Sequence, residues 1–338
     1  MKKRVAFIGL GKQNTEDHLV AALKSENVEI VAVCDTSKAL AKQWAKSLGV
    51  ACYYSVDELI DGAELDAAVV AVPHNQHFEI TCKLLQKGVH VFKEKPLAIT
   101  LSEAWELSNI AKKKKVNLIV SVQRKHSRVY QTYLEYAKYI GDVFSIHGEY
   151  TLNIDRLDEG WRSKKEIAGG GAVLDMGYHL IDLVVWYFGV PDRISADLGY
   201  HNRLSQTYDV EDTAKIQFSY DKGKRRILGS LLISRIYPQK DEGLFIYGVN
   251  GAIKIYKNKI DLYDINRELQ ESTFVKANGQ DVQLQFDSFI ASITAGDYTG
   301  NHEDHLKDMI FIDAIYCSDA KSRTVLPRQD KAYKDYLR

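Results

Sequence analysis

Val5-Ala6-Phe7-Ile8-Gly9-Leu10-Gly11 is the stretch of sequence that decides the fold of the first part of the chain. Its four apolar residues form a run typical of a buried β-strand, and a glycine turn follows directly. Comparable runs recur with helical patterns between them, at 28–34, 51–54, 67–72, 89–92 and 116–122. Because strands that alternate with helices form a parallel sheet covered on both faces, we expect an α/β domain of Rossmann type over residues 1–123.

The pattern changes after Gln123. Long alternating segments predict strands that follow one another with few helices between them, at 143–154, 193–200, 213–219 and 226–234, with a hairpin over 244–263 that turns at Asn250-Gly251. Helical patterns occupy 127–139, 177–187, 283–295 and 303–320. Strands joined without crossover helices pair in antiparallel fashion. We therefore expect an α+β domain with a large, open, mostly antiparallel sheet over residues 124–338.

Composition excludes several classes of protein. The 338 residues include 45 Lys plus Arg and 45 Asp plus Glu, so the formal net charge is zero and gives no bulk attraction to nucleic acid or membranes. The 4 cysteines form no CxxC pair, which argues against a disulfide framework or a zinc site. The basic N-terminus precedes too short an apolar run for a signal peptide, and no stretch is long enough to span a membrane. We expect a soluble cytoplasmic protein without a bound metal.

Gly9 and Gly11 stand where a dinucleotide-binding turn needs glycines, between the first strand and the first helix. The third glycine of that fingerprint is replaced by Asn14. Asp35 ends the second strand, close to the distance at which an acidic residue binds the adenosine ribose. A carboxylate there favours NAD over NADP, although Lys38 could offset its repulsion of a 2′-phosphate. Lys38 can equally be a solvent-exposed residue of a first helical turn, so NADP stays open as an alternative.

Two clusters further along the chain carry candidate chemistry. Lys95 lies in Glu94-Lys95-Pro96 at the end of a strand, and ligands of open α/β sheets bind beyond such ends. The same lysine could simply begin a loop. Asp175 and His179 follow Gly169-Gly170-Gly171 and are four residues apart, so on a helix they share a face with Asp182. An imidazole beside a carboxylate suits general-base work. The alternative is a capping aspartate and a histidine satisfied in the core.

Together these motifs resemble the glucose–fructose oxidoreductase/inositol dehydrogenase/rhizopine-catabolism (Gfo/Idh/MocA) family over nearly the whole chain. The matching segments, in the order of the family, are the first two glycines, Val72-Pro73-His74-Asn75 with His77, Glu94-Lys95-Pro96, Trp161-Arg162, the triple glycine, Asp175, His179 and Asp182. Asn14 departs from the family pattern, and one extra residue lies between Gly11 and His18. The resemblance implies a Rossmann domain followed by an open sheet that often forms an oligomer interface.

The resemblance also implies an activity and a set of site residues. It implies an NAD(P)-dependent dehydrogenase that exchanges a hydride between nicotinamide and a hydroxyl-bearing carbon of a sugar or polyol. Lys95 would hydrogen-bond the reacting oxygen, His179 would be the acid–base, and Asp175 would contact the substrate or assist the proton exchange. In some relatives the lysine is itself the acid–base. The expected cofactor-binding residues are Gly9, Gly11, Lys12, Gln13, Asp35, Lys38, Val72, Pro73, His74, His77, Glu94, Lys95, Arg124, Trp161 and Arg162.

The substrate is less defined by the sequence. Lys95, Asn153, Arg162, Asp175 and His179 are the expected substrate-binding residues, with Trp161 either part of the site or part of the core. Nearby basic residues could bind a phosphate or carboxylate of a sugar, or could belong to a solvated loop. Three other functions stay open on the same fold: a glycosidase that uses NAD transiently, a dinucleotide-binding regulator without turnover, and chemistry like that of biliverdin reductase or trans-dihydrodiol dehydrogenase. The expected partners are a small sugar, polyol or sugar phosphate and further copies of the chain, as a homodimer or homotetramer.

Overall fold

A computed structural model describes residues 1–276 and 280–337, which form two compact units. The first unit contains Met1–Gln123 and the described residues from helix α9 (Gln280–Ala295) to Leu306. The second begins at Arg124 and resumes at Lys307. The boundary after Gln123 is where the sequence pattern changes, but α9 belongs to the first unit rather than to the second domain. The reason is apolar packing, because Phe286 and Phe289 of α9 lie against Phe92, with ring centroids 5.7 and 5.5 Å away.

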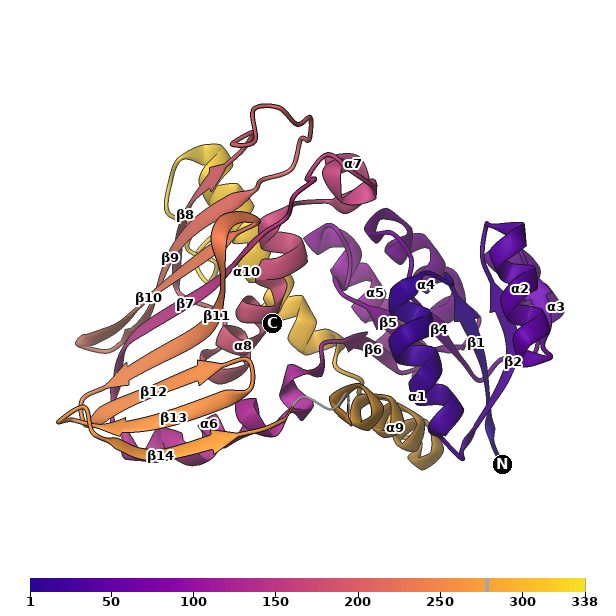
Figure 1. Cartoon of the computed structure of the whole chain (residues 1–338), viewed down its shortest axis with the longest axis horizontal. Helices are drawn as coiled ribbons and strands as arrows, with labels where there is room; N and C mark the ends of the chain where they lie inside the picture. The colour runs from indigo at the N-terminus through magenta and orange to yellow at the C-terminus, as the bar shows by residue number, and fades with distance from the viewer. Residues whose placement is uncertain (277–279, 338) are drawn as a thin grey trace. The chain divides into compact units, whose positions relative to one another are not determined.

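The first unit is built on a six-stranded parallel sheet in the order β3-β2-β1-β4-β5-β6 (Figure 1). This order places a topological switch point between β1 and β4, where open α/β sheets bind ligands. The strands are β1 (Lys3–Ile8), β2 (Val28–Cys34), β3 (Ala51–Tyr53), β4 (Ala67–Val70), β5 (His90–Glu94) and β6 (Leu118–Ser121). Besides α9, the helices are α1 (Leu19–Lys24), α2 (Lys38–Leu48), α3 (Val56–Gly62), α4 (His77–Gln86) and α5 (Leu101–Lys114). Helix α3 was not predicted.

The second unit is built on an eight-stranded sheet in the order β14-β13-β12-β11-β7-β10-β9-β8. Neighbouring strands are antiparallel except β7 and β10, so the prediction of a mostly antiparallel sheet is confirmed. The strands are β7 (Val143–Asn153), β8 (Arg193–Gly199), β9 (Thr213–Lys222), β10 (Arg225–Ser234), β11 (Ile236–Gly248), β12 (Gly251–Tyr256), β13 (Lys259–Asp264) and β14 (Leu269–Phe274). The expected hairpin over 244–263 is part of three strands, and its first turn is Val249-Asn250, one residue earlier than predicted.

Helices cover one face of the eight-stranded sheet. They are α6 (Arg128–Tyr136), α8 (Tyr178–Phe188) and α10 (His302–Lys321), whose first residues belong to the first unit. The short α7 (Lys165–Ala168) follows the 3₁₀ turn at Trp161–Ser163. A Cβ on Gly148 of β7 would lie 3.6 Å from Leu180 of α8, so the even-numbered side of β7 faces the helices. His147 lies on the opposite face, where its Nδ1 is 3.0 Å from Ser230 Oγ. Short 3₁₀ segments connect these elements, at His74–Gln76, Gln123–His126, Ala137–Tyr139, Trp161–Ser163 and Lys331–Tyr333.

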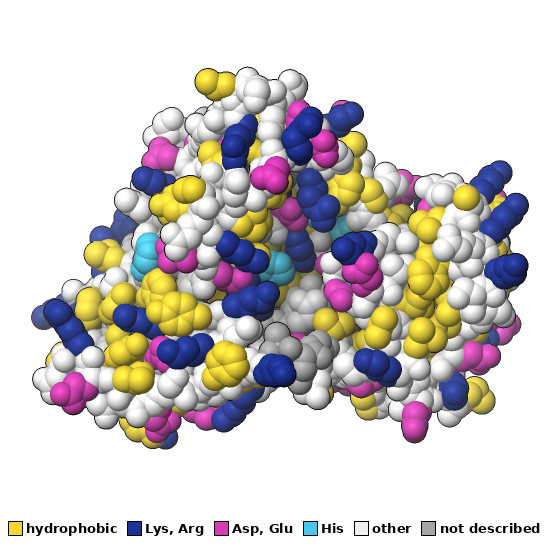
Figure 2. All heavy atoms as spheres, in the orientation of Figure 1, with side chains coloured by type: hydrophobic (Ala, Val, Ile, Leu, Met, Phe, Trp, Pro, Cys, Tyr) yellow, Lys and Arg dark blue, Asp and Glu magenta, His cyan; other side chains and the backbone are white. Residues whose placement is uncertain are grey.

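The surface agrees with the balanced composition. On the face drawn in Figure 2, basic and acidic side chains are interspersed rather than segregated by sign. Among the helices that the structure describes, none combines the length and hydropathy needed to cross a bilayer.

Candidate active site

The glycine turn after β1 has the geometry that its sequence predicted. Gly9 has φ +77°, and a Cβ there would lie 2.3 Å from the carbonyl oxygen of Ala71, so only glycine fits. Gly11 differs, because a Cβ on it would have no described protein atom within 4 Å. Open space at Gly11 leaves room for a group outside the protein to approach the backbone, as a pyrophosphate does in dinucleotide-binding turns.

Asn14 explains how the turn works without its third glycine. The side chain is fully buried, and its Nδ2 donates to the carbonyl oxygens of Gly9, at 2.6 Å, and Ile8, at 3.2 Å. Asn14 therefore fastens the turn to the end of β1. The segment Asn14–His18 is a π-helical turn, η1, ahead of α1. A π turn takes up one residue more than the α-helix it interrupts, which accounts for the extra residue before His18.

Asp35 is coupled to the same turn. Its Oδ2 accepts from the backbone N–H of Leu10 at 2.7 Å, and its Oδ1 accepts from that of Ser37 at 2.8 Å. Each carboxylate oxygen can accept a further hydrogen bond, so these contacts leave capacity for ribose hydroxyls. Lys38 is exposed at the start of α2, with Nζ 5.4 Å from the ring centre of Tyr54. Lys12 and Gln13 pair with acidic side chains one turn further along their own helical segment.

Lys95 lies just beyond the carboxyl end of β5 and is half-buried. The preceding residue, Glu94, has its Oε1 2.6 Å from Nε2 of His18, which is completely buried. His18 thereby ties the end of β5 to the helical segment after the glycine turn. Glu94 was expected to bind the cofactor, but its contact in the structure is with this histidine.

The segment after β4 was also expected to contact the cofactor. Val72 and Pro73 are half-buried there, but His74 and His77 are buried. Nε2 of His77 is 3.0 Å from the carbonyl oxygen of Val72, and its Nδ1 is 2.9 Å from Nζ of Lys93. His77 thus fixes the backbone rather than presenting its ring at the surface of the unit.

In the second unit, the glycine-rich turn is held by a residue that the sequence analysis did not identify. Glu211 is 2% exposed, and its carboxylate accepts from the backbone N–H of Gly171, at 2.8 Å, and of Val173, at 2.9 Å. Tyr316 donates to the same carboxylate at 2.8 Å. A Cβ on Gly171 would lie 2.0 Å from the carbonyl oxygen of Glu211, so the glycine permits this close approach. Burial raises the pKa of Glu211, while the backbone donors act in the opposite direction.

Asp175 forms ion pairs with two arginines. Arg235 Nη2 lies 2.8 Å from Asp175 Oδ2, and Arg162 Nε lies 3.2 Å from the same oxygen. The side chain of Arg235 is 3% exposed, whereas that of Arg162 is 54% exposed. Arg235 therefore fixes the carboxylate from inside the unit, and Arg162 contacts it from the solvent side. Arg162 was predicted from its motif, whereas Arg235 lies in no local motif that would identify it.

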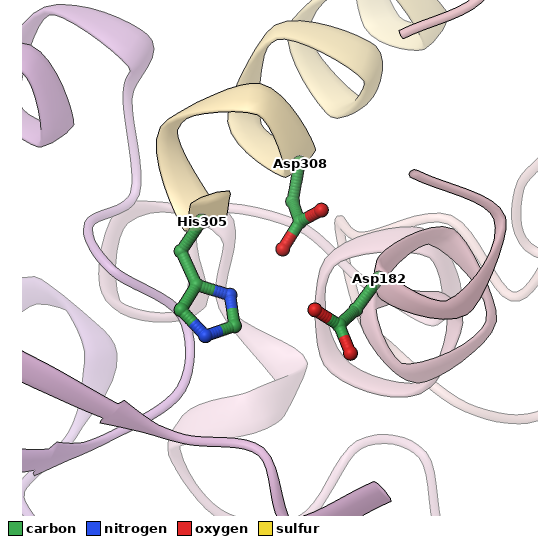
Figure 3. A group of neighbouring side chains, drawn as sticks. All are labelled: Asp182, His305 and Asp308. Atoms are coloured by element: carbon green, nitrogen blue, oxygen red, sulfur yellow. The ribbon is translucent and has the colours of Figure 1, made fainter. Parts of the chain in front are cut away.

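The sequence pattern grouped Asp182 with Asp175 and His179, but the surroundings of Asp182 differ from those of the other two. Asp175 belongs to a π-helical segment, η6 (Ala172–Gly177), and His179 is half-buried in the first turn of α8. Asp182 is fully buried, with Oδ1 3.1 Å from Nζ of Lys125. Its carboxylate points toward Asp308 of α10, as Figure 3 shows. Asp182 is thus an internal residue, and only Asp175 and His179 retain the exposure that a reaction centre requires.

Three other predicted residues have partners inside the second unit. Arg124 forms an ion pair with Glu242, and its guanidinium carbon lies 5.4 Å from the ring centre of Tyr130. Trp161 packs against a small apolar cluster. The guanidinium carbon of Arg162 lies over the Trp161 ring, 4.2 Å from the ring centre. Asn153 accepts from Arg203. Strand alternation places Asn153 on the sheet face of His147, opposite the face that carries α8.

Two family models match the chain. One, described as an oxidoreductase family with an NAD-binding Rossmann fold, matches residues 3–122. The other, described as the GFO/IDH/MocA C-terminal domain, matches residues 136–254. Together they cover most of both units.

Individual relatives are distant. An uncharacterized oxidoreductase of Schizosaccharomyces pombe is 31% identical over 211 residues, which make up 60% of this chain and 56% of that protein. Glucose-6-phosphate 3-dehydrogenase of Bacillus subtilis is 29% identical over 262 residues, which make up 72% of this chain and 71% of the relative. The match thus spans little more than half of the first relative. The solved structure of levoglucosan dehydrogenase with NADH and levoglucosan has a TM-score of 0.83 at 20% identity, with 96% of this chain and 99% of that one covered. That likeness shows the fold.

Proposed function

This chain belongs to the Gfo/Idh/MocA oxidoreductase family, and from that premise we propose that it transfers a hydride between NAD and a hydroxyl-bearing carbon of a sugar or polyol. The observation that carries the proposal is the arrangement in the second unit. An aspartate held by two arginines precedes a half-buried histidine by one helical turn, in a turn fixed by Glu211. A protein that only binds dinucleotide has no need of such a constellation. The B. subtilis relative, a sugar phosphate 3-dehydrogenase by name, supports the substrate class.

The first unit fits a dinucleotide on geometric grounds. Gly9 is in a conformation that only glycine adopts without strain, Gly11 opens onto free space, and Asp35 lies at the end of β2 beside the turn. These are the parts that bind a pyrophosphate and an adenosine ribose in Rossmann domains. The nicotinamide of bound NAD supplies the hydride acceptor. We propose NAD rather than NADP because the carboxylate of Asp35 would repel a 2′-phosphate.

The residues of the chain then handle the proton and the charge of the reacting oxygen. We propose that the His179 imidazole removes the hydroxyl proton as the carbon is oxidised, since histidine is suited to proton transfer near neutral pH. Lys95 donates a hydrogen bond to the same oxygen and stabilises its alkoxide character. Asp175 orients the substrate through a hydroxyl, and Arg162, the exposed member of its ion pairs, contacts a neighbouring oxygen.

The test follows absorbance at 340 nm with NAD and with NADP, over a panel of sugars, sugar phosphates and inositols. We expect a substrate-dependent rise with NAD that His179→Ala lowers by about 10²–10⁴-fold, the usual contribution of a general base. His147→Ala is the matched control, because His147 is a half-buried histidine on the opposite face of the sheet. It should keep the wild-type rate.

Other outcomes would assign a different function. Clear NAD binding with no reduction of NAD by any compound, together with release of an aglycone from a glycoside, would favour an enzyme that recycles its hydride. Binding without any turnover would favour a regulator. Equal rates for His179→Ala and wild type, with loss of activity in Lys95→Ala, would make Lys95 the acid–base and refute our assignment of roles.

A further inference from the structure

Lys93 is a completely buried lysine beside the segment that carries Lys95, and the reaction proposed above does not use it. It precedes Lys95 by two residues in β5, and its exposed fraction is 0%. Nζ is 2.7 Å from the carbonyl oxygen of Pro96, 2.6 Å from that of Leu97 and 2.9 Å from Nδ1 of His77. All of these partners are neutral groups. A buried lysine without a carboxylate partner is costly, so its presence calls for a specific role.

The partners restrict where the protons lie. Nε2 of His77 lies 3.0 Å from the carbonyl oxygen of Val72, and Nδ1 lies 3.0 Å from that of Pro96 as well as 2.9 Å from Nζ of Lys93. A carbonyl only accepts, so whichever ring nitrogen carries the hydrogen of a neutral imidazole binds its carbonyl. With that hydrogen on Nε2, Nδ1 accepts from Lys93, and the three N–H donors of the ammonium match the three acceptors around Nζ.

The electrostatic surroundings favour a neutral imidazole. Burial lowers the pKa of His77, and the charge of Lys93 and the nearby His74 lower it further. Burial also lowers the pKa of Lys93 well below its ordinary value, while Glu94 and Glu103 oppose that shift. The shared hydrogen bond therefore depends on a proton that Lys93 holds less firmly than an exposed lysine does.

The network connects two loops that flank the cofactor-binding edge of the sheet. Lys93 closes the backbone after β5 around Lys95, because its Nζ binds the carbonyls three and four residues further along. His77, at the start of α4, extends the same network to Val72 after β4. Both contacts lie within the first unit. The loop that carries Lys95 is thus fixed to its neighbour by buried side chains rather than by backbone pairing.

We infer that Lys93 and His77 are a buried positioning pair that orients the loop bearing Lys95, with Lys93 donating to Nδ1 of His77. The pair touches neither substrate nor cofactor in this assignment and acts through the placement of Lys95. The inference rests on the proposed role of Lys95, but its proton arrangement is a property of the first unit alone.

The first experiment reads the proton arrangement directly, by ¹⁵N NMR of the full chain labelled at histidine, with His77→Gln to assign the signal. We expect His77 to carry hydrogen on Nε2 and to accept at Nδ1, and we expect Lys93→Met to shift the Nδ1 resonance toward that of an acceptor without a donor. Lys83→Met is the matched control, since Lys83 lies on α4 but is paired with Asp57 and Glu79 at the surface. Hydrogen on Nδ1 in the wild type would overturn the inference.

The second experiment separates positioning from folding. In Lys93→Met, with the fold verified by its unfolding transition, we expect kcat to fall by about 10–100-fold and the KM of the sugar to stay within about threefold, because a displacement of about 1 Å near a reacting group costs rates of that order. Should Lys93→Met fail to fold, His77→Gln tests the same loss. An unchanged kcat in a folded variant would overturn the inference. Absence of turnover in the wild type would instead refute the proposed function, while the NMR result would still decide the pair.

Discussion

Replacing Arg235 tests whether Asp175 is held from inside the second unit. We compare Arg235→Met, which keeps an unbranched apolar side chain but removes the guanidinium, with Arg162→Gln. Both arginines contact Asp175 Oδ2, at 2.8 and 3.2 Å, but their side chains are 3% and 54% exposed. The two variants therefore remove the same kind of contact from opposite sides of one carboxylate.

The expected magnitudes follow from burial. Breaking a fully buried ion pair costs about 3–5 kcal/mol because the remaining charge is left uncompensated. Asp175 is 13% exposed and keeps Arg162, so we expect Arg235→Met to lower the free energy of unfolding by about 2–3 kcal/mol, below that range. An exposed ion pair contributes about 0–1 kcal/mol, which is the loss expected for Arg162→Gln. At about 2–4 °C per kcal/mol for a unit of this size, Arg235→Met should lower Tm by about 4–12 °C.

Calorimetry measures the stability, and turnover of the best sugar found in the 340 nm screen measures the effect on the reaction. Arg235→Lys, which keeps the charge but not the forked donors, should recover part of both. The double variant Asp175→Asn with Arg235→Met should cost less than the sum of the two single changes, since the residues interact. Equal losses of stability in Arg162→Gln and Arg235→Met, or additive behaviour in the double variant, would refute this account of the site.

Three further predictions concern the first unit. Gly9→Ala should destabilise the first unit by more than about 1–2 kcal/mol, the cost of a left-handed backbone for a residue with a Cβ. Gly11→Ala should keep Tm and weaken NADH binding, measured by fluorescence. A loss of stability in Gly11→Ala but not in Gly9→Ala would contradict the geometry of the turn. Asp35→Ala should shift the ratio of kcat/KM values toward NADP by about tenfold or more, as expected when a repulsive charge is removed; an unchanged ratio would exclude Asp35 from the ribose site. Burial lowers the pKa of His302 to about 4, so His302 binds its proton less tightly in the folded protein than in the unfolded chain. The stability that neutral His302 contributes above pH 6.5 should therefore be lost as the pH falls toward 4. Tm measured from pH 7 to pH 4 should fall less steeply in His302→Asn, and parallel curves would rule this out.

The sequence determined the fold class because the signals involved are local. Apolar runs of four to seven residues, glycines after a strand, and the change from helical to alternating periodicity all act within a few positions of the chain. The first two glycines, Asp35, Lys95, Asp175 and His179 could be chosen in the same way, since their neighbours in sequence give each a recognisable setting. Helix α3 and strand β14 were not predicted because both are short and β14 is mostly exposed.

Only the tertiary structure decided which partners hold those residues. Arg235 is 60 residues from Asp175, His18 is 76 from Glu94, and Glu211 is 40 from Gly171. Sheet pairing and helix packing bring these residues together, and no spacing in the sequence records such contacts. The same holds for α9, whose apolar face could have packed on either unit and is buried in the first because Phe286 and Phe289 fit against Phe92. Local periodicity therefore fixed which elements form, whereas long-range packing determined which polar side chains meet and, with them, the environment of the candidate site.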